Sequence, residues 1–216
     1  MSRTTLPFAD RSDAGRRLAA ALTHYANNPA VRVLGLPRGG VPVASEIALA
    51  LKAPLDVFVI RKLGVPGEPE LAMGAIASGG VRVLNYDVIE RLRIAPHAVE
   101  AVALREGLEL TRQLRSYRPR AELLDIKGRI VILVDDGLAT GATMRAAVTA
   151  LRKLIPARIV VAVPVGAREI CAVLDQEADE VVCLYTPHPF KAVGRWYRDF
   201  RQTTDDEVAR LLNLSV

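Results

Sequence analysis

Short, continuous apolar runs recur along the chain, and each is about as long as one β-strand. Runs of this kind lack the polar-apolar alternation of a half-exposed strand, so they indicate strands that are buried on both faces. We predict such strands at residues 31–36, 55–60, 129–134, 158–163 and 180–184.

Between these runs, apolar residues recur every three or four positions, as they do in amphipathic helices. Strands that alternate with helices in this way predict an α/β fold: a Rossmann-like, mainly parallel sheet flanked by helices. In such sheets, ligands bind beyond the carboxyl ends of the strands, where the strand order reverses. The predicted helices cover residues 12–26, 43–51, 96–118, 143–154, 167–174 and 204–212.

One region departs from this alternation. Two β-prone runs at residues 74–78 and 81–85 are joined by Gly79-Gly80, which predicts a hairpin, and residues 64–74 have the Pro, Gly and Glu content of a mobile loop. We therefore expect one domain over residues 1–216, made of three parts. These are a core at about 28–185, a flexible loop and hairpin at about 63–86, and a C-terminal segment at about 186–216.

Composition narrows the class of protein. A chain of 216 residues that is 50% hydrophobic and 25% charged can bury a full core, which excludes a disordered chain. No apolar run approaches the roughly 18 residues of a membrane-spanning helix, so no membrane association is expected. Cys171 and Cys183 are too few for a disulfide framework and are interpreted as core thiols. With no signal-peptide pattern at the start, we expect a cytoplasmic setting.

The basic residues are mostly arginine. The net charge is +5, and only five of the 29 basic residues are lysine. Arginine suits bidentate recognition of phosphate or carboxylate, although most of these side chains are expected to be solvated. Because the chain lacks a lysine-rich tail and zinc-finger spacing, nucleic-acid binding is not expected.

The strongest chemical signal follows the strand at residues 129–134. Asp135 and Asp136 come directly after it, and a loop rich in Gly and Thr then leads to a helix that starts near Thr143. Free backbone N–H groups at a helix N-terminus can cradle a phosphate, and the two acids would face hydroxyls, a cation or a developing positive charge on the same ligand. The alternative is an ordinary strand-turn-helix with solvated aspartates. The loop lacks the Lys-Ser/Thr ending of a P-loop.

Residues 131–143 resemble the phosphoribosyl pyrophosphate signature of type I phosphoribosyltransferases: four apolar residues, two acids, a short loop and Thr-Gly-Ala-Thr. More loosely, the whole chain resembles a bacterial branch of phosphoribosyltransferases whose acceptor is unassigned. The resemblance implies the family's fold and Mg²⁺, bound chiefly by pyrophosphate and ribose oxygens. It also implies that Asp135 and Asp136 contact the ribose hydroxyls. The 5-phosphate would be held by Gly137, Ala139, Thr140, Gly141 and Thr143.

Two further groups of residues are candidates for pyrophosphate binding. Pro37, Arg38, Gly39 and Gly40 follow the first strand, where type I enzymes have a pyrophosphate loop; on sequence alone a tight turn is equally compatible. Arg61-Lys62 is placed at the carboxyl end of the second predicted strand, where two cations would neutralise departing pyrophosphate. A solvated strand end is the alternative.

Aromatic residues gather near the C-terminus, at Phe190, Trp196 and Tyr197. They would form a hood that stacks on a planar acceptor, or they would simply pack an irregular segment onto the core. Glu70 and His188 are further candidates without an assigned role.

The resemblance implies transfer of the 5-phosphoribosyl group from phosphoribosyl pyrophosphate to a nitrogenous base or similar acceptor, with release of pyrophosphate. Asp135, Asp136, Arg61 and Lys62 would be the catalytic residues, acting by positioning and preorganised charge. The alternative is a regulatory protein that senses phosphoribosyl pyrophosphate without turnover, with nucleic acid as a second ligand. Family habit and apolar helix faces suggest a homodimer.

Overall fold

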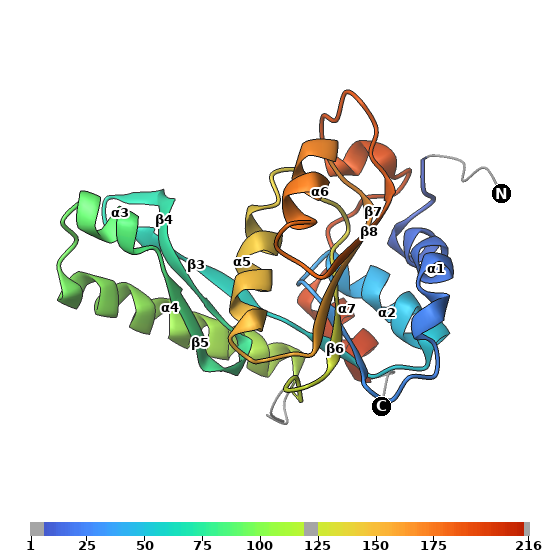
Figure 1. Ribbon diagram of the computed structural model, residues 1–216, viewed down its shortest axis with the longest axis horizontal. Coiled ribbons are helices and arrows are strands. Elements are labelled where there is room, and N and C mark those ends of the chain that lie inside the picture. The colour runs from blue at the N-terminus through green and yellow to red at the C-terminus, as the bar shows by residue number, and fades with distance from the viewer. Residues whose placement is uncertain (1–6, 119–124, 214–216) are drawn as a thin grey trace.

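A five-stranded parallel sheet forms the centre of the protein in the computed structural model, which describes residues 7–118 and 125–213 (Figure 1). The strand order is β2-β1-β6-β7-β8, and every neighbouring pair is parallel, so the predicted sheet is confirmed. The strands are β1 (Val31–Gly35), β2 (Leu55–Val57), β6 (Ile130–Val134), β7 (Arg158–Val165) and β8 (Glu180–Tyr185).

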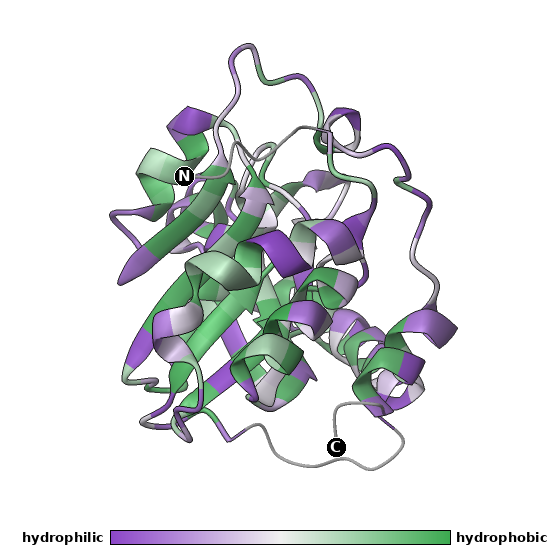
Figure 2. Ribbon diagram, turned by 90° about the vertical axis from the view of Figure 1, so that its right-hand side faces the viewer, coloured by the Kyte–Doolittle hydropathy of each residue, from purple (hydrophilic) through white to green (hydrophobic). Residues whose placement is uncertain are grey.

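Helices cover both faces of this sheet, and each face has its own apolar core (Figures 1 and 2). One face packs against α1 (Arg11–Ala21), α2 (Gly40–Leu51) and α7 (Asp205–Asn213); the other packs against α5 (Ala142–Arg152) and α6 (Arg168–Leu174). Burial on both faces explains why the strands have continuous apolar sequences.

The order of the strands reverses between β1 and β6. These two strands are adjacent, with Gly35 opposite Val134, but the chain leaves β1 toward β2 on one side and leaves β6 toward β7 on the other. The loops that follow β1 and β6 therefore emerge side by side, at the position where ligands bind in open parallel sheets.

A second, antiparallel sheet projects from the body of the protein and is seen at the left of Figure 1. It packs against α4 through an apolar core of its own, which includes Leu63 and Met73 from the sheet and Val102 from the helix. We call residues 60–117 the arm. Its elements are β3 (Ile60–Val65), β4 (Glu68–Ala77), η2 (Ser78–Gly80), β5 (Val81–Leu84), α3 (Tyr86–Arg91) and α4 (Pro96–Tyr117).

Two predictions from the sequence are wrong in and beside the arm. The apolar run at residues 55–60 is not one strand: β2 ends at Val57, and β3 begins at Ile60 in the other sheet. The run stays apolar because Phe58 and Val59 are buried where the chain crosses between the sheets, with Ser78 Oγ accepting the Val59 N–H. The segment at 64–74 is also not a loop, because β3 and β4 pair around a short turn. The Gly79-Gly80 hairpin is confirmed.

Both ends of the described chain join the body. Helix α1 is shorter than predicted and is followed by the turn η1 (Thr23–Tyr25). Within the C-terminal segment, η3 (Val193–Trp196) leads to α7, which buries Val208 and Leu212 in the core shared with α1 and α2.

Among the residues that the structure describes, none of the helices combines the length and apolar character needed to cross a membrane.

A glycine allows α2 to start directly beside the end of β6. A Cβ on Gly40 would lie 2.5 Å from the Val134 carbonyl oxygen and 2.9 Å from the Asp135 Cα, which are backbone atoms of the central strand. We predict that Gly40→Ala lowers the free energy of unfolding by about 1–3 kcal/mol, because the clash forces a backbone shift. Urea unfolding measures this change.

Gly107→Ala is the matched control, since it places the same residue in helix α4. There the added Cβ would meet only the Ile76 Cδ1 at an ordinary 3.5 Å. Alanine is the better helix former by about 1 kcal/mol, so this variant is expected to be unchanged or more stable. Equal losses for both variants would contradict the argument from close approach.

Candidate functional site

The loop after β1 and the end of β6 touch directly. A Cβ on Gly39 would collide with Asp136 Oδ2, so only glycine leaves room for that carboxylate. Pro37 and Arg38 complete the loop, and the peptide bond between them is cis. The structure therefore brings together two groups of residues that lie about a hundred positions apart in the sequence, residues 37–40 and 135–136.

The two aspartates are held in a desolvated, negatively charged position. Asp135 Oδ1 accepts the Asp136 N–H at 2.8 Å. Burial raises the pKa of the Asp135 carboxyl, and the neighbouring charge of Asp136 raises it further. Burial also raises the pKa of Asp136. Such a pair is costly to keep ionised in the absence of a partner, and acids perturbed in this way are candidates for a functional site.

Arg11, at the start of α1, is that partner for Asp136. Its Nε and Nη2 both lie 2.8 Å from Asp136 Oδ2, and its Nη1 donates to the Arg201 carbonyl oxygen. The guanidinium also lies 4.0 Å above the centre of the Phe200 ring. Because Arg11 counteracts the effect of burial on the pKa of Asp136, it favours the ionised carboxylate.

The loop from Gly137 to Thr143 forms a hollow of about 180 Å³ at the N-terminus of α5. Leu138 anchors it: its N–H donates to the Val165 carbonyl oxygen, and its own carbonyl oxygen accepts the Ala167 N–H. Within the described part of the chain, the N–H groups of Ala139, Thr140 and Gly141 donate to no protein acceptor. Gly141 has a φ of +69°, which suits glycine at this turn. Free N–H groups beside the N-terminus of a helix are the donors that anion sites use, so this hollow is a candidate anion site.

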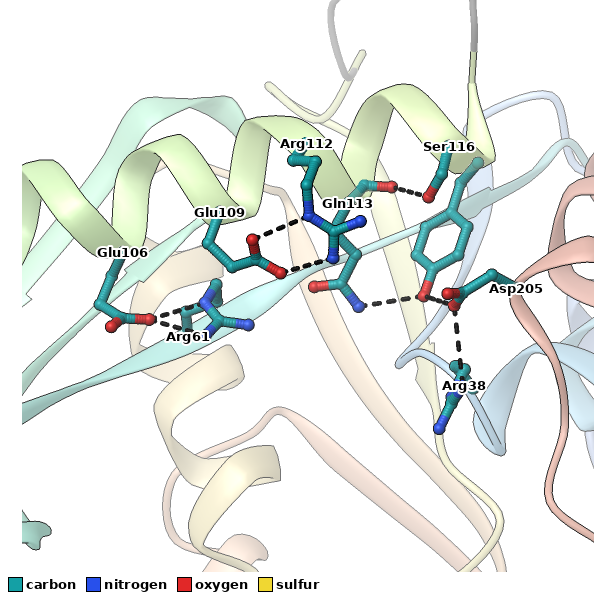
Figure 3. Close-up of polar contacts among 9 residues, drawn as sticks. Arg38, Arg61, Glu106, Glu109, Arg112, Gln113, Ser116 and Asp205 are labelled. Carbon is teal, nitrogen blue, oxygen red and sulfur yellow. Dashed lines mark hydrogen bonds and ion pairs between the residues drawn. The ribbon is translucent and has the colours of Figure 1, made fainter.

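Arg38 lies beside Asp205, the first residue of α7 (Figure 3). Its Nη1 lies 3.9 Å from Asp205 Oδ1, and that same oxygen accepts the Tyr117 hydroxyl at 2.9 Å. The Arg38 side chain remains 36% exposed, so the guanidinium is available to a ligand above the loop.

Arg61 and Lys62 are not at the carboxyl end of a parallel strand, as the sequence suggested, but near the start of β3 in the arm. Arg61 pairs with Glu106 at 2.7 Å, and Lys62 pairs with Glu70 at 3.0 Å. Tyr117, the last residue of α4 and a partner of Asp205, follows Glu106 by eleven residues, which is about 16 Å along a helix. The structure therefore does not bring Arg61 and Lys62 to the loops. They line a separate cavity of about 550 Å³ between the β3–β4 turn and α4.

The C-terminal aromatic residues pack against one another and against the N-terminal segment. Tyr197 is buried beside Phe8, and its hydroxyl donates to the Asp136 carbonyl oxygen at 2.6 Å. Phe190 and Trp196 stack with their ring centres 6.4 Å apart. Among the described side chains, the Trp196 indole N–H is a buried donor without a hydrogen-bond acceptor. His188 is exposed.

Sequence reasoning missed Arg11, Tyr117 and Asp205 as neighbours of the site. Asp205 begins α7 within the acidic run Asp205-Asp206-Glu207, and nothing in that local sequence indicates a contact with Arg38. Arg11 is one arginine among many, and its pairing with Asp136 spans 125 positions. Only the fold reveals both contacts.

Comparison with known proteins agrees with this geometry. The family model of the phosphoribosyl transferase domain matches residues 9–194. A Mycobacterium tuberculosis protein assigned as a phosphoribosyl transferase is 52% identical over 206 residues, which are 95% of this chain and 46% of that protein. This chain thus spans about half the length of that relative.

Two further proteins are similar over different lengths of the chain. The bifunctional protein PyrR of Roseiflexus is 35% identical over 133 residues, covering 59% of this chain and 67% of PyrR. The crystal structure of TT1426 from Thermus thermophilus is 44% identical, covers 96% of this chain and 98% of its own, and superimposes with a TM-score of 0.82. The loops and acids described above thus lie within a matched family domain, and the chain belongs to the type I phosphoribosyltransferase family.

Proposed function

We propose that the protein transfers the 5-phosphoribosyl group of phosphoribosyl pyrophosphate to a nitrogenous acceptor and releases pyrophosphate. The observation that carries this proposal is the meeting of the 137–143 loop, Asp135, Asp136 and the 37–40 loop at the point of strand reversal. Together these groups provide an anion site, hydrogen-bond acceptors and a cation within one crevice. The arrangement matches the successive parts of a phosphorylated, pyrophosphorylated ribose.

The 5-phosphate would bind the N–H groups of Ala139, Thr140 and Gly141 and the hydroxyls of Thr140 and Thr143. Asp135 and Asp136 would accept hydrogen bonds from the ribose 2- and 3-hydroxyls, which stabilises their ionised forms in place of lost water. Arg38 would donate to the pyrophosphate from the neighbouring loop.

A divalent cation fits the charge balance of this crevice. Arg11 and Arg38 each face an aspartate already, and Arg61 and Lys62 are paired within the arm. Pyrophosphate therefore brings charge that these side chains do not offset. Mg²⁺, which binds through substrate phosphates and keeps several waters, would enter with the ligand and neutralise the leaving group.

The protein's own contribution to the reaction is positioning and charge. As the bond from C1 to pyrophosphate lengthens, positive charge develops on the ribose ring. Ionised Asp135 and Asp136 would lie beside the hydroxyl-bearing edge of that ring and stabilise this charge without reorganising. A fixed 5-phosphate and fixed hydroxyls would leave C1 oriented toward the acceptor.

The second candidate is a regulatory protein on the same fold that binds phosphoribosyl pyrophosphate without turning it over. Relatives named as bifunctional PyrR support keeping it. Pyrophosphate release in the presence of a panel of nitrogenous bases separates the two functions.

We also propose a cytoplasmic homodimer. Leu104 and Leu108, which are 68% and 66% exposed on one side of α4, are candidates for the dimer contact.

The first test is calorimetric titration of phosphoribosyl pyrophosphate with Mg²⁺ into the wild type, Asp135→Asn, Asp136→Asn and the double variant. We expect each single variant to weaken binding by about tenfold or more, because a charge-assisted hydrogen bond is worth about 1.5–3 kcal/mol. A folded wild type that does not bind would contradict both candidate functions.

Stability provides a second readout for the same variants. Because the pKa of Asp135 is raised in the folded state, its ionisation costs stability, and this cost appears as the pH rises above the pKa of the unfolded chain. Asp135→Asn is therefore expected to unfold at a higher temperature than the wild type at neutral pH, and the gain should disappear in acid. The pKa of Asp136 is raised as well, but Asp136→Asn also leaves Arg11 without its carboxylate, so this variant should gain less stability than Asp135→Asn. Identical thermal shifts at neutral pH would refute this assignment.

Arg11 provides a test of positioning through pH dependence. Asp136 is faced by Arg11, by the Asp135 carboxylate and by the Tyr197 hydroxyl, which donates to its backbone carbonyl. Removing the guanidinium in Arg11→Met should raise the pKa of Asp136. As the pH is lowered, Asp136 then becomes protonated earlier, so the variant should lose phosphoribosyl pyrophosphate binding at a higher pH than the wild type does. If the pKa rises by one, binding on the acid side should weaken about tenfold, with recovery toward alkaline pH.

Arg11→Lys is the matched control, since it keeps the charge but loses the two-point contact, and its pKa change should be smaller. Titrations across the pH range give the profile directly. A loss of binding that is the same at every pH would show that Arg11 acts on shape alone and not on the ionisation of Asp136.

A further inference from the structure

The two cysteines of the chain, which were interpreted from the sequence as core thiols, meet behind the loop of residues 137–143, which we call the phosphate loop. Cys171 lies on α6 and Cys183 lies on β8, and both side chains are only partly buried. An ideal Cβ on Gly166 would lie 2.8 Å from the Cys171 Sγ and 3.4 Å from the Cys183 Sγ. Both sulfur atoms therefore crowd the same face of Gly166, where the absence of a side chain makes room for them.

The surroundings favour reaction at Cys171 first. The single Cys183 S–H has two acceptors within reach, the Tyr185 carbonyl oxygen at 3.2 Å and the Cys171 sulfur. The hydrogen bond between the two cysteines lowers the pKa of the Cys171 thiol and raises that of the Cys183 thiol. Since the thiolate is the nucleophile, and Cys171 is partly exposed, an oxidant from solvent would reach the more reactive sulfur directly.

We propose that Cys171 and Cys183 are a reversible dithiol-disulfide site for peroxides, and that its oxidation weakens ligand binding at the phosphate loop.

The chemistry balances with hydrogen peroxide as oxidant. The Cys171 thiolate attacks one peroxide oxygen and, with one proton taken up, gives a sulfenic acid and water. The Cys183 sulfur then attacks the Cys171 sulfur, forming the S–S bond and releasing a second water. Each sulfur loses one electron, and the peroxide takes up both. A dithiol reductant reverses the step by thiol-disulfide exchange.

The coupling to the phosphate loop follows from the contacts of α6. Ile170, next to Cys171, packs under Gly141: a Cβ on Gly141 would lie within van der Waals overlap of the Ile170 side chain. Gly166 pairs with Leu138, whose hydrogen bonds anchor the other end of the loop. Closing an S–S bond of about 2 Å draws α6 toward β8, and so moves the support on which Gly141 rests. This half of the proposal rests on the proposed function.

The first experiment needs no ligand. Wild-type protein is treated with hydrogen peroxide, blocked with a thiol reagent and digested with trypsin. No Lys or Arg occurs between Arg168 and Lys191, so one peptide, residues 169–191, carries both cysteines. We expect this peptide to lose two hydrogens and to escape blocking. Cleavage after Glu177 or Glu180 should leave its two halves joined until a reductant is added.

Cys171→Ser and Cys183→Ser serve as the comparison. The first should react slowly with peroxide, and the second should accumulate a sulfenic acid at Cys171. Independent oxidation of both thiols, disulfides between chains, or a disulfide that forms only in denaturant would overturn the proposal. If a serine variant does not fold, the wild-type peptide result decides the point alone.

The second experiment tests the coupling. Hydrogen exchange at residues 138–143 is compared in the reduced and oxidised wild type, and phosphoribosyl pyrophosphate is titrated into both. We expect faster exchange and about tenfold weaker binding after oxidation, reversed by reductant. The doubly substituted Cys171→Ala, Cys183→Ala protein should bind equally well before and after peroxide.

The outcomes separate the two ideas. A disulfide that forms while exchange and affinity stay unchanged overturns the coupling. If reduced protein shows no binding but the exchange change is present, the proposed function fails and the redox site remains.

Discussion

The whole site depends on how closely the loop after β1 approaches the end of β6. Gly39 and Gly40 make this possible, because any side chain there would overlap Asp136 or the backbone of the central strand. The parallel register of β1 and β6 then fixes the height at which the two loops emerge. Residues 37–40 and 135–143 are therefore one unit in space, although they belong to separate strand-helix units in sequence.

The close approach of the two loops buries the charges of Asp135 and Asp136, and residues near both ends of the described chain offset this electrostatic cost. Two carboxylates held side by side in a desolvated crevice repel each other, so at least one needs a cation. Arg11 supplies that cation from the first helix, and Phe200 and the Arg201 carbonyl hold Arg11 in place from the C-terminal segment. Phe8 and Trp196 bond through their backbones in the same layer. The sequence left two interpretations of the C-terminal aromatic residues, a hood over an acceptor or packing onto the core. The structure shows them packed, with the Tyr197 hydroxyl donating to the Asp136 carbonyl oxygen.

The sequence predicted those parts of the fold and site whose residues are neighbours in the chain, and it did not predict those that depend on contacts between distant residues. The parallel sheet and the 135–143 loop could be predicted because apolar runs, adjacent acids and a Gly/Thr-rich turn are contiguous features. The prediction of one strand at residues 55–60 was wrong because the residues stay buried where the chain crosses from one sheet to the other. An apolar run cannot show that the chain changes from one sheet to another. Arg11 and Asp205 could not be found, since a long-range ion pair leaves no mark on the sequence around either partner.

Under the proposed function, the position of Arg61 and Lys62 changes where the charge of the leaving pyrophosphate would be balanced. Helix α4 is one rigid element that carries Glu106, the partner of Arg61, near its middle and Tyr117, the partner of Asp205, at its end. The helix packs along β3 and against α7, so these two positions stay apart. For the arm's cations to reach the crevice, the arm would have to swing as a body about the buried crossing at Phe58 and Val59. In the geometry seen here, the proposed function would instead rely on Arg38, on backbone donors and on a cation that enters with the ligand. Pyrophosphate would then compete with Asp205 for Arg38.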